Sequence, residues 1–348
     1  MRAVSRPPAH VAPLRYVVQV DAVSPAFTAV LVDVALRTAH PTARLVASTD
    51  EGRTFRSIGP RVPDGTHGDS VFFLDRTHGW FTVALDGDAT DLLYRTTDGG
   101  RTWKHWRVAG HSAGAPAVDQ VLFTDAQHGW LNAVSGTGPQ QSLFRSTDGG
   151  RTWRSVRTGR TRADSSLGYL DVGSFRLWRS GWYGGQTTVG ADGGRNWRRS
   201  GPSVHGTPGE VAVFGRTVIA PMVVRSCRAC EAGRLRIFRA TGNGGWKPVA
   251  SSPRVFSWQG GRSISSSFVT PGSGWIAGVG AHGRIVVFRY RDGILRRIRA
   301  PELTGSQVTI RAPGARQAWL SVVPPRGAGG PQIFVTRDAG REWHRVRP

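Results

Sequence analysis

The sequence predicts an all-β fold of seven similar units, and three observations support this prediction. A short motif that ends in a large apolar residue recurs along the 348 residues, its copies are almost evenly spaced, and short β-prone runs fill the intervals. The closing residues are Phe55, Trp103, Trp153, Trp197, Trp246, Leu295 and Trp343, at spacings of 48, 50, 44, 49, 49 and 48 residues. A repeat of this length that holds four short strands is typical of a β-propeller blade.

Four strands are predicted within each unit. In the second unit, runs rich in Val, Phe, Trp and Thr lie at residues 70–74, 80–85, 92–96 and 103–108, separated by turns that contain Gly and Asp. The third unit repeats this plan at residues 121–123, 130–134, 142–146 and 153–156. Because no sustained period of 3.6 residues occurs, few helices are expected.

The repeats predict one closed domain. We expect a flexible leader at residues 1–13, followed by a seven-bladed β-propeller of four-stranded antiparallel blades at residues 14–348. One such sheet cannot bury both of its faces, whereas sheets stacked around an axis can. Residues 16–20 can supply the first strand and residues 342–346 the last, so repeats and blades should coincide. The predicted units cover residues 14–60, 68–108, 117–158, 167–201, 209–251, 263–300 and 306–348.

A second series of tryptophans begins the second strand of most units, usually directly after Gly. Its members are Trp80, Trp130, Trp182, Trp275 and Trp319. Rings of this size at repeated positions of an apolar strand are expected to pack between neighbouring blades.

The excess of basic residues has two possible explanations. The formal net charge is +23, and Lys104 and Lys247 are the only lysines among 46 basic residues. A strongly basic chain suggests an anionic partner. The preference for Arg, together with abundant Ala, Gly and Val, is equally explained by a GC-rich genome. No RNA-binding motif or lysine-rich tail accompanies the charge, so specific nucleic-acid binding is not expected.

The recurring motif Ser/Thr-x-Asp-x-Gly-x-Thr-Trp/Phe is the Asp-box, or BNR repeat. Its Asp can accept backbone N–H groups within its own turn, its Gly permits positive φ, and its ring is buried at the base of the fourth strand. We therefore expect a structural role, and no catalytic one, for Asp50, Asp98, Asp148, Asp192 and Asp338.

A second motif precedes the Asp-box in two units. Residues 73–80 read FLDRTHGW and residues 123–130 read FTDAQHGW, with weaker forms at residues 267–275 and 313–319. Together the two motifs resemble the photosystem II stability/assembly factor-like family, within the wider sialidase-like superfamily. The resemblance implies a bacterial, non-catalytic propeller that binds a protein through an Arg-rich surface, and an exported protein. No clear signal peptide is visible.

The Asp-box also resembles that of exo-sialidases, which leaves a glycan-active enzyme as the alternative function. Sialidases resemble one another in an Arg triad, an Arg-Ile-Pro segment, an Asp acid and a Tyr/Glu nucleophile pair. Here no Arg-Ile-Pro occurs. Only five Glu exist, and two of them, Glu51 and Glu342, lie in Asp-box turns. We therefore expect no sialidase-type catalytic residues.

Minor motifs carry little chemistry. Residues 110–114 match a nucleophile elbow and residues 278–283 a dinucleotide fingerprint, but neither stands between a strand and a helix. Cys227 and Cys230 form a lone C-x-x-C, for which a disulfide, free thiols or redox work stay open. A zinc site would lack half its ligands. No metal, no cofactor, no transmembrane segment and a monomer are expected.

The predicted binding surface is the loop face. If the strand assignment holds, the Asp-box turns lie on one face, and the interblade connections and second-to-third strand loops lie on the other. We expect a protein, anionic or glycan partner to bind there, at Arg61, His67, Arg157, Arg160, Arg162, His205, Arg254, Trp258 and Arg262.

Overall fold

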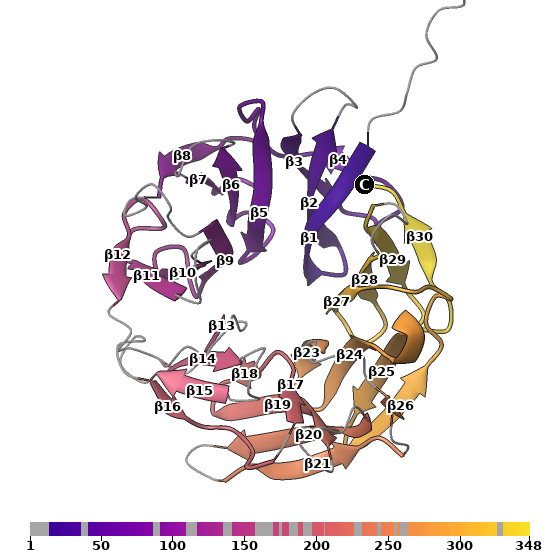
Figure 1. The fold of residues 1–348 in the computed structure, drawn as a ribbon. Coiled ribbons are helices and arrows are strands. Elements are labelled where there is room, and N and C mark those ends of the chain that lie inside the picture. The colour runs from indigo at the N-terminus through magenta and orange to yellow at the C-terminus, as the bar shows by residue number, and fades with distance from the viewer. Residues whose placement is uncertain are drawn as a thin grey trace, which may run out of the picture.

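The structure is a ring of small antiparallel sheets, with the first strand of each sheet nearest the centre (Figure 1). This computed structural model describes residues 14–35, 41–85, 91–108, 117–134, 141–156, 170–173, 176–180, 187–190, 197–204, 206–225, 232–241, 245–253, 256–257, 264–325 and 330–348. The predicted all-β propeller is confirmed. In the described part of the chain the one helical element is the 3-10 turn η1 (Ala281–Gly283), and no helix there is long and apolar enough to cross a membrane.

The first three sheets follow the predicted repeats. Blade 1 contains β1 (Leu14–Ser24), β2 (Phe27–Ala35), β3 (Thr42–Ser48) and β4 (Arg56–Ser57). Blade 2 contains β5 (Thr66–Phe73), β6 (Gly79–Leu85), β7 (Asp91–Thr96) and β8 (Lys104–Arg107). Blade 3 contains β9 (Ala117–Phe123), β10 (Gly129–Val134), β11 (Gln141–Ser146) and β12 (Arg154–Val156). The first strands of blades 2 and 3 begin four residues earlier than the sequence predicted.

The remaining sheets keep the same order of strands. Blade 4 contains β13 (Leu170–Gly173), β14 (Arg176–Ser180), β15 (Thr187–Gly190) and β16 (Trp197–Arg199). Blade 5 contains β17 (Gly206–Pro208), β18 (Ala212–Phe214), β19 (Thr217–Arg225), β20 (Ala232–Thr241), β21 (Lys247–Ser251) and β22 (Phe256–Ser257). Blade 6 contains β23 (Ser265–Thr270), β24 (Ser273–Val279), β25 (Ile285–Arg291) and β26 (Ile294–Ile298). Blade 7 contains β27 (Gln307–Arg311), β28 (Ala318–Val323), β29 (Gln332–Thr336) and β30 (His344–Val346).

Repeats and sheets coincide at both ends of the described chain. β1 pairs with β2 of its own repeat, and β30 pairs with β29. Blades 1 and 2 share one parallel bridge, between Thr42 and Thr66, and are otherwise separate antiparallel sets. No described strand of blade 7 pairs with one of blade 1, so side chains hold these two blades together.

The segment from Phe to Gly-Trp forms a compact hairpin in blades 2, 3 and 6. Phe73 lies directly opposite Gly79 across the first and second strands, and Phe123 lies opposite Gly129 in the same way. A Cβ at Gly79 would overlap the Phe73 ring, and Gly274 stands in the same relation to Phe268. Gly therefore precedes the second-strand Trp because the Phe ring occupies the space above it.

The second-strand tryptophans pack between blades, as predicted. Trp80 of blade 2 stacks on Phe123 of blade 3, with ring centroids 3.8 Å apart, and its Nε1 donates to the Gly149 carbonyl at 2.9 Å. Trp275 and Trp319 are also fully buried, against blades 7 and 1 respectively. Trp182 lies outside the described residues.

Arginines paired across strands with these rings link blade 2 to blade 3 and blade 6 to blade 7. The Arg95 guanidinium lies over the Trp80 ring, 5.7 Å from its centroid, and donates to the Ala126 carbonyl of blade 3 at 3.0 Å. Arg289 repeats the arrangement over Trp275 and donates to the Ala315 carbonyl of blade 7. Part of the Arg excess is thus structural, since Lys lacks the planar fork that can cover a ring and donate sideways.

Each described Asp-box is a closed network of hydrogen bonds. Asp98 accepts from the Thr102 hydroxyl at 2.6 Å, the Thr102 N–H at 2.9 Å and the Thr96 hydroxyl at 2.8 Å. These bonds, the Thr102 hydroxyl foremost, lower the pKa of Asp98 to about 2. Asp50 and Asp148 make the same contacts, and Asp338 makes most of them. The predicted local, structural use of the Asp carboxylate agrees with this geometry.

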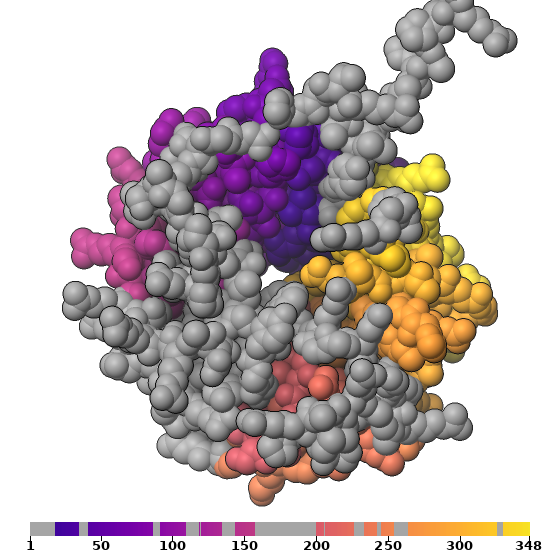
Figure 2. All heavy atoms as spheres, in the orientation of Figure 1, coloured from indigo at the N-terminus to yellow at the C-terminus, as the bar shows by residue number. Residues whose placement is uncertain are grey.

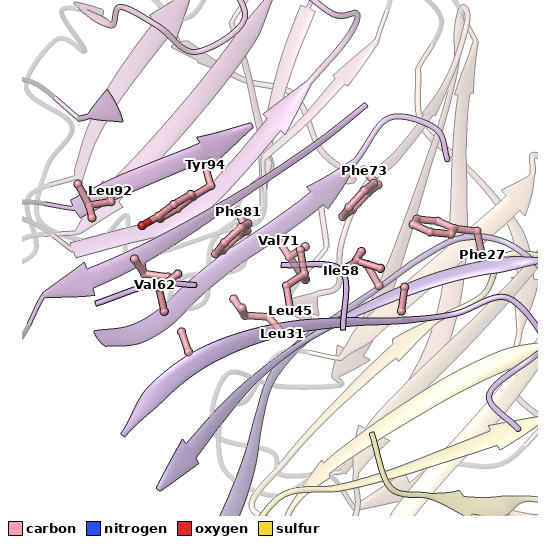
Figure 3. Packing of buried hydrophobic residues seen from close by; sticks show 14 residues of the cluster. Phe27, Leu31, Leu45, Ile58, Val62, Val71, Phe73, Phe81, Leu92 and Tyr94 are labelled. Carbon is pink, nitrogen blue, oxygen red and sulfur yellow. The ribbon is translucent and has the colours of Figure 1, made fainter. Parts of the chain in front are cut away.

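The apolar core is a series of layers between blades. Between blades 1 and 2, Leu31 and Leu45 face Val71 and Phe81, and Phe27 contacts Phe73 edge to face (Figure 3). Equivalent layers lie between blades 2 and 3, 5 and 6, and 6 and 7. With the seam described next, the sheets of blades 1, 2, 6 and 7 therefore bury both faces against their neighbours, which is the packing that the repeat predicted.

Blades 7 and 1 meet at a seam held by packing and one guanidinium. Val20, Val30 and Val32 of blade 1 share a buried cluster with Trp319 and Val335 of blade 7. In addition, Nε and Nη2 of Arg337 donate to the Glu51 carbonyl at 3.0 and 2.6 Å. Val335 occupies the position of Arg95, opposite the second-strand Trp, and the seam guanidinium comes instead from Arg337 within the Asp-box turn of blade 7.

Filling the space above a hairpin glycine should destabilise the fold. Gly79→Ala is expected to lower the free energy of unfolding by about 1–3 kcal/mol, because the new methyl group displaces Phe73 from the core. Gly245→Ala is the control, since a Cβ there meets nothing within 4 Å. Urea unfolding measures both, and equal effects of the two changes would contradict this account.

Removing the guanidinium at the seam should weaken closure of the ring. Arg337→Met leaves the Glu51 carbonyl without its charged donor and is expected to cost about 1–3 kcal/mol of unfolding free energy. Arg341→Met, in the same turn but exposed, should change it by less than about 0.5 kcal/mol. The comparison is made by chemical denaturation, and an unaffected Arg337→Met protein would show that packing alone closes the ring.

Candidate functional site

Two of the nine predicted binding residues lie in the described part of the chain, both between blades 1 and 2. Arg61 is exposed on the connection that precedes β5, and His67 lies near the start of β5. His67 Nδ1 is 3.5 Å from Asp33 Oδ2, and its side chain is 46% exposed. The other seven, Arg157, Arg160, Arg162, His205, Arg254, Trp258 and Arg262, lie outside the described residues, as do Asp192, Cys227 and Cys230.

His67 is positioned by a carboxylate that sequence reasoning did not single out. Asp33 ends the buried stretch of β2, and its Oδ1 accepts the Gly68 N–H of blade 2 at 2.9 Å. Burial raises the pKa of Asp33, while the Gly68 N–H and His67 oppose the shift. Asp33 thus links blades 1 and 2, and the His67 side chain stays partly exposed beside it.

The inner strands are linked by side chains that accept backbone N–H groups of the next blade. Gln19 Oε1 accepts from Val71 N at 2.9 Å, and Asp21 Oδ2 accepts from Phe73 N at 2.5 Å. The same kind of contact recurs between blades 2 and 3 (Ser70 to Val121 and Asp91 to Val118) and between blades 6 and 7 (Ser265 to Ile310 and Ser267 to Ala312). These bonds satisfy strand edges that would otherwise face the centre of the ring unpaired.

Polar side chains from blades 5, 6 and 7, two of them charged, meet near the inner strands. Arg311 Nη1 lies 2.9 Å from Glu210 Oε2, and Glu210 Oε1 accepts the Ser265 hydroxyl at 2.9 Å. Burial raises the pKa of Glu210, while Arg311 and Ser265 oppose the shift. Asp21 of blade 1 also feels the Arg311 charge, but burial dominates and raises its pKa to about 6.

These acids are poorly suited to hydrolysis. We call Asp21, Asp33, Asp91 and Glu210 the interblade carboxylates, because each bonds to a group of another blade. A glycosidase needs one carboxyl free to protonate the leaving group and a second group free to attack. Within the described residues no three His, Cys, Asp or Glu side chains are grouped so that they could hold a metal ion.

Sequence reasoning missed the interblade acceptors, although a signal was present. In the first strands of blades 1 and 6, Gln19 and Asp21 are two residues apart, and so are Ser265 and Ser267. A period of two places both members of a pair on one face of a strand. The sequence does not show which strand faces each pair, because the N–H groups that they accept belong to residues 45 to 52 positions later in the chain.

Positive charge is concentrated on the outermost strands. Each of them carries Lys or Arg, and none of these described strands carries Asp or Glu: β4, β8, β12, β16, β21, β26 and β30. The exposed cations include Arg56, Lys104, Arg154, Lys247 and Arg296. Cations along exposed strand edges discourage edge-to-edge pairing, so the outer wall is positive while several acids lie nearer the centre.

The centre of the ring is open on the face shown in Figure 2. The opening is bordered, among the described residues, by blade 1 in indigo and the C-terminal blades in orange and yellow (Figure 2).

Solved structures share this architecture. YCF48 bound to D1 peptide is 14% identical, with 99% of each chain covered and a TM-score of 0.52. The fold of this chain is similar to that of YCF48. YCF48 from Cyanidioschyzon merolae is 14% identical over 89% of this chain and 94% of its own, with a TM-score of 0.57. The BP39L lectin from Burkholderia pseudomallei is 15% identical over 93% and 96%, with a TM-score of 0.56. No protein-family model and no curated protein matches the sequence.

The raised pKa of Asp21 gives the fold a pH dependence that can be measured. With a pKa of about 6 in place of 3.8, the folded protein holds this proton more tightly than the unfolded chain. Ionising Asp21 therefore lowers the free energy of unfolding as the pH rises from about 4 to about 6, by up to about 3 kcal/mol. Asp21→Asn keeps an acceptor for Phe73 N–H, so its stability should vary less with pH over this window. Parallel profiles from urea unfolding would refute the assignment.

Proposed function

We propose that this propeller is a non-catalytic binding protein that holds a protein or anionic partner on its loop face, as an assembly or scaffold factor. The observation that carries the proposal is the use of the interblade carboxylates. Asp21, Asp33 and Asp91 accept backbone N–H groups, and Glu210 is bound by Arg311, so these acids stabilise the ring. A rigid ring with variable loops is a scaffold suited to recognition.

Two further observations support a partner on the loop face. Arg61 is exposed on the connection before β5, and His67 is half-exposed beside a fixed carboxylate. Among solved propellers of the same fold, YCF48 is described as bound to D1 peptide. A protein segment is therefore a reasonable class of partner for this chain, and the net charge of +23 favours an acidic one.

The test is co-purification of partners from the native host with charge-reversed variants. Changing Arg157, Arg160 and Arg162 to Glu should abolish recovery of a partner that the wild-type protein retains. The control changes Arg101, Arg151 and Arg341 to Glu, which alters the net charge equally at exposed positions of the Asp-box turns. Recovery that is unchanged, or is lost equally in both variants, would contradict a loop-face site.

The alternative, glycan hydrolysis, is tested on the same preparations. The proposal predicts no turnover of aryl glycosides above the buffer rate. Turnover that disappears in Asp21→Asn or Glu210→Gln, while the variant stays folded by circular dichroism, would overturn the binding assignment and favour an enzyme.

A further inference from the structure

A basic residue follows the closing residue of every repeat, near the start of the outermost strand. Lys, Arg and His together make up about one residue in six of the chain, so composition alone does not explain its presence in all seven repeats. In the fourth repeat this residue is Arg198. The six members whose side chains the structure describes, which we call the cationic belt, are Arg56, Lys104, Arg154, Lys247, Arg296 and His344.

The basic residue is kept where the Asp-box is lost. Residues 240–246 of blade 5 contain no Asp, and in blade 6 the two-residue turn Asp292–Gly293 joins the last two strands. Lys247 and Arg296 nevertheless follow these turns at the usual place. The belt is therefore not a part of the Asp-box hydrogen-bond network and needs a separate explanation.

The belt is not explained by stability. In four blades its member lies directly opposite an Arg of the third strand, where a like charge destabilises the sheet and an acid would stabilise it. The pairs are Arg95–Lys104, Arg145–Arg154, Arg239–Lys247 and Arg289–Arg296. Protection of a strand edge is served by charge of either sign. The uniform positive charge therefore indicates an anionic ligand.

The pairing register places the belt at the outer ends of the junctions between blades. Lys104 shares a face of its sheet with Arg95 and Trp80, because directly paired residues lie on the same side. Trp80 stacks on blade 3, and Arg95 donates to a carbonyl of that blade. Lys104 thus lies beside blade 3 at the outer wall of the ring, and Arg296 stands in the same relation to blade 7 (Figure 1).

The charges of the belt are accessible to a ligand. All six side chains are exposed. His344 lies 3.9 Å from Glu342 Oε2 at an exposed position. Among the residues that the structure describes, the other five form no ion pair with an acidic side chain. The outer wall therefore offers an accessible cation on each of six blades.

A ligand for this surface must be long and flexible. The belt members lie on different blades, so one ligand reaches several of them only by bending around the ring, which costs a stiff DNA duplex much energy. Single-stranded nucleic acid stacks its bases on accessible rings. In the described part of the chain the one exposed large apolar side chain is Ile294, so no such ring is offered.

The belt recognises charge and little else. Arg, Lys and His occur interchangeably in it, so the shared property is positive charge and not the planar fork of Arg. The next residue is Ser, His, Ser, Arg, Pro, Arg and Arg in the seven repeats. No shared polar group thus stands beside the cation to select the hydroxyl groups of a polysaccharide.

We propose that the cationic belt binds a flexible linear polyphosphate chain along the outer wall. Such a chain carries negative charge on every unit and has no base, ring or hydroxyl group that would need a partner of its own. Lys and Arg both bind phosphate oxygens, Lys as a point charge. The site is on the outer wall and does not rest on the loop-face proposal.

The test is binding of end-labelled inorganic polyphosphate, followed by fluorescence polarisation over a range of salt concentrations. The belt variant combines Lys104→Gln, Arg154→Gln and Arg296→Gln. Its affinity at low salt should fall about tenfold or more, and the slope of log affinity against log salt should become shallower by about 2–3. The control combines Arg76→Gln, Arg216→Gln and Arg316→Gln, an equal charge change at exposed positions of turns that precede β6, β19 and β28, and should stay within about twofold of wild type.

Thermal melting separates binding from folding. The belt variant relieves three like-charge pairs, so it should melt no lower than wild type, and added polyphosphate should stabilise the wild-type protein more than the belt variant. A belt variant that melts well below wild type would contradict the argument from like charges.

Two binding results would overturn the proposal. Equal losses in the belt variant and the control would mean that net charge alone attracts the chain. Tighter binding of polyglutamate, polygalacturonate or oligothymidylate with the same number of charges would assign the belt to another class of ligand. Recovery of a loop-face partner is measured separately, so failure of either proposal leaves the other testable.

Discussion

The structure depends on satisfying the inner edge of each sheet. A ring of separate sheets exposes the first strand of every blade, and its backbone N–H groups must find acceptors. Here Gln19 and Asp21 serve blade 2, Ser70 serves blade 3, and Ser265 serves blade 7. Each such bond also joins two neighbouring blades. A single contact therefore satisfies a backbone N–H group and helps to hold the ring together.

This arrangement separates charge along the radius of the ring. Near the inner strands, Asp21 accepts a backbone N–H group and Glu210 is bound by Arg311. Burial raises the pKa of both carboxyl groups, because its effect is larger than that of these bonds. The exposed outermost strands carry cations and, as far as they are described, no acids. Arginines between these regions, such as Arg95 and Arg289, tie the second-strand Trp to the following blade. The high net charge thus has at least two structural uses before any partner is considered.

The seam differs from the other junctions for a topological reason. Consecutive blades are connected by the chain, whereas blades 7 and 1 meet only through side chains, including Trp319 and Arg337. In other respects the seam follows the repeat, because Gly52 of the blade 1 Asp-box turn lies against the Trp319 ring of blade 7, as Gly150 of blade 3 lies against Leu93 of blade 2.

Most of the fold could be predicted from the sequence alone, because it is local and repeated. Residues within one hairpin determine three features: the Phe opposite Gly, the Gly before Trp, and the Asp-box. The all-β propeller, its strand order and the structural role of Asp98 could therefore be predicted. Of the candidate binding residues, Arg61 could be placed on the connection between blades 1 and 2, whereas His67, expected in the same loop, lies within β5. Their neighbours could not, since Asp33 reaches Gly68 across 35 residues and Arg337 reaches Glu51 across 286. Such contacts depend on how far each blade is rotated from the next. That rotation comes from packing between sheets, and only the tertiary structure decided it.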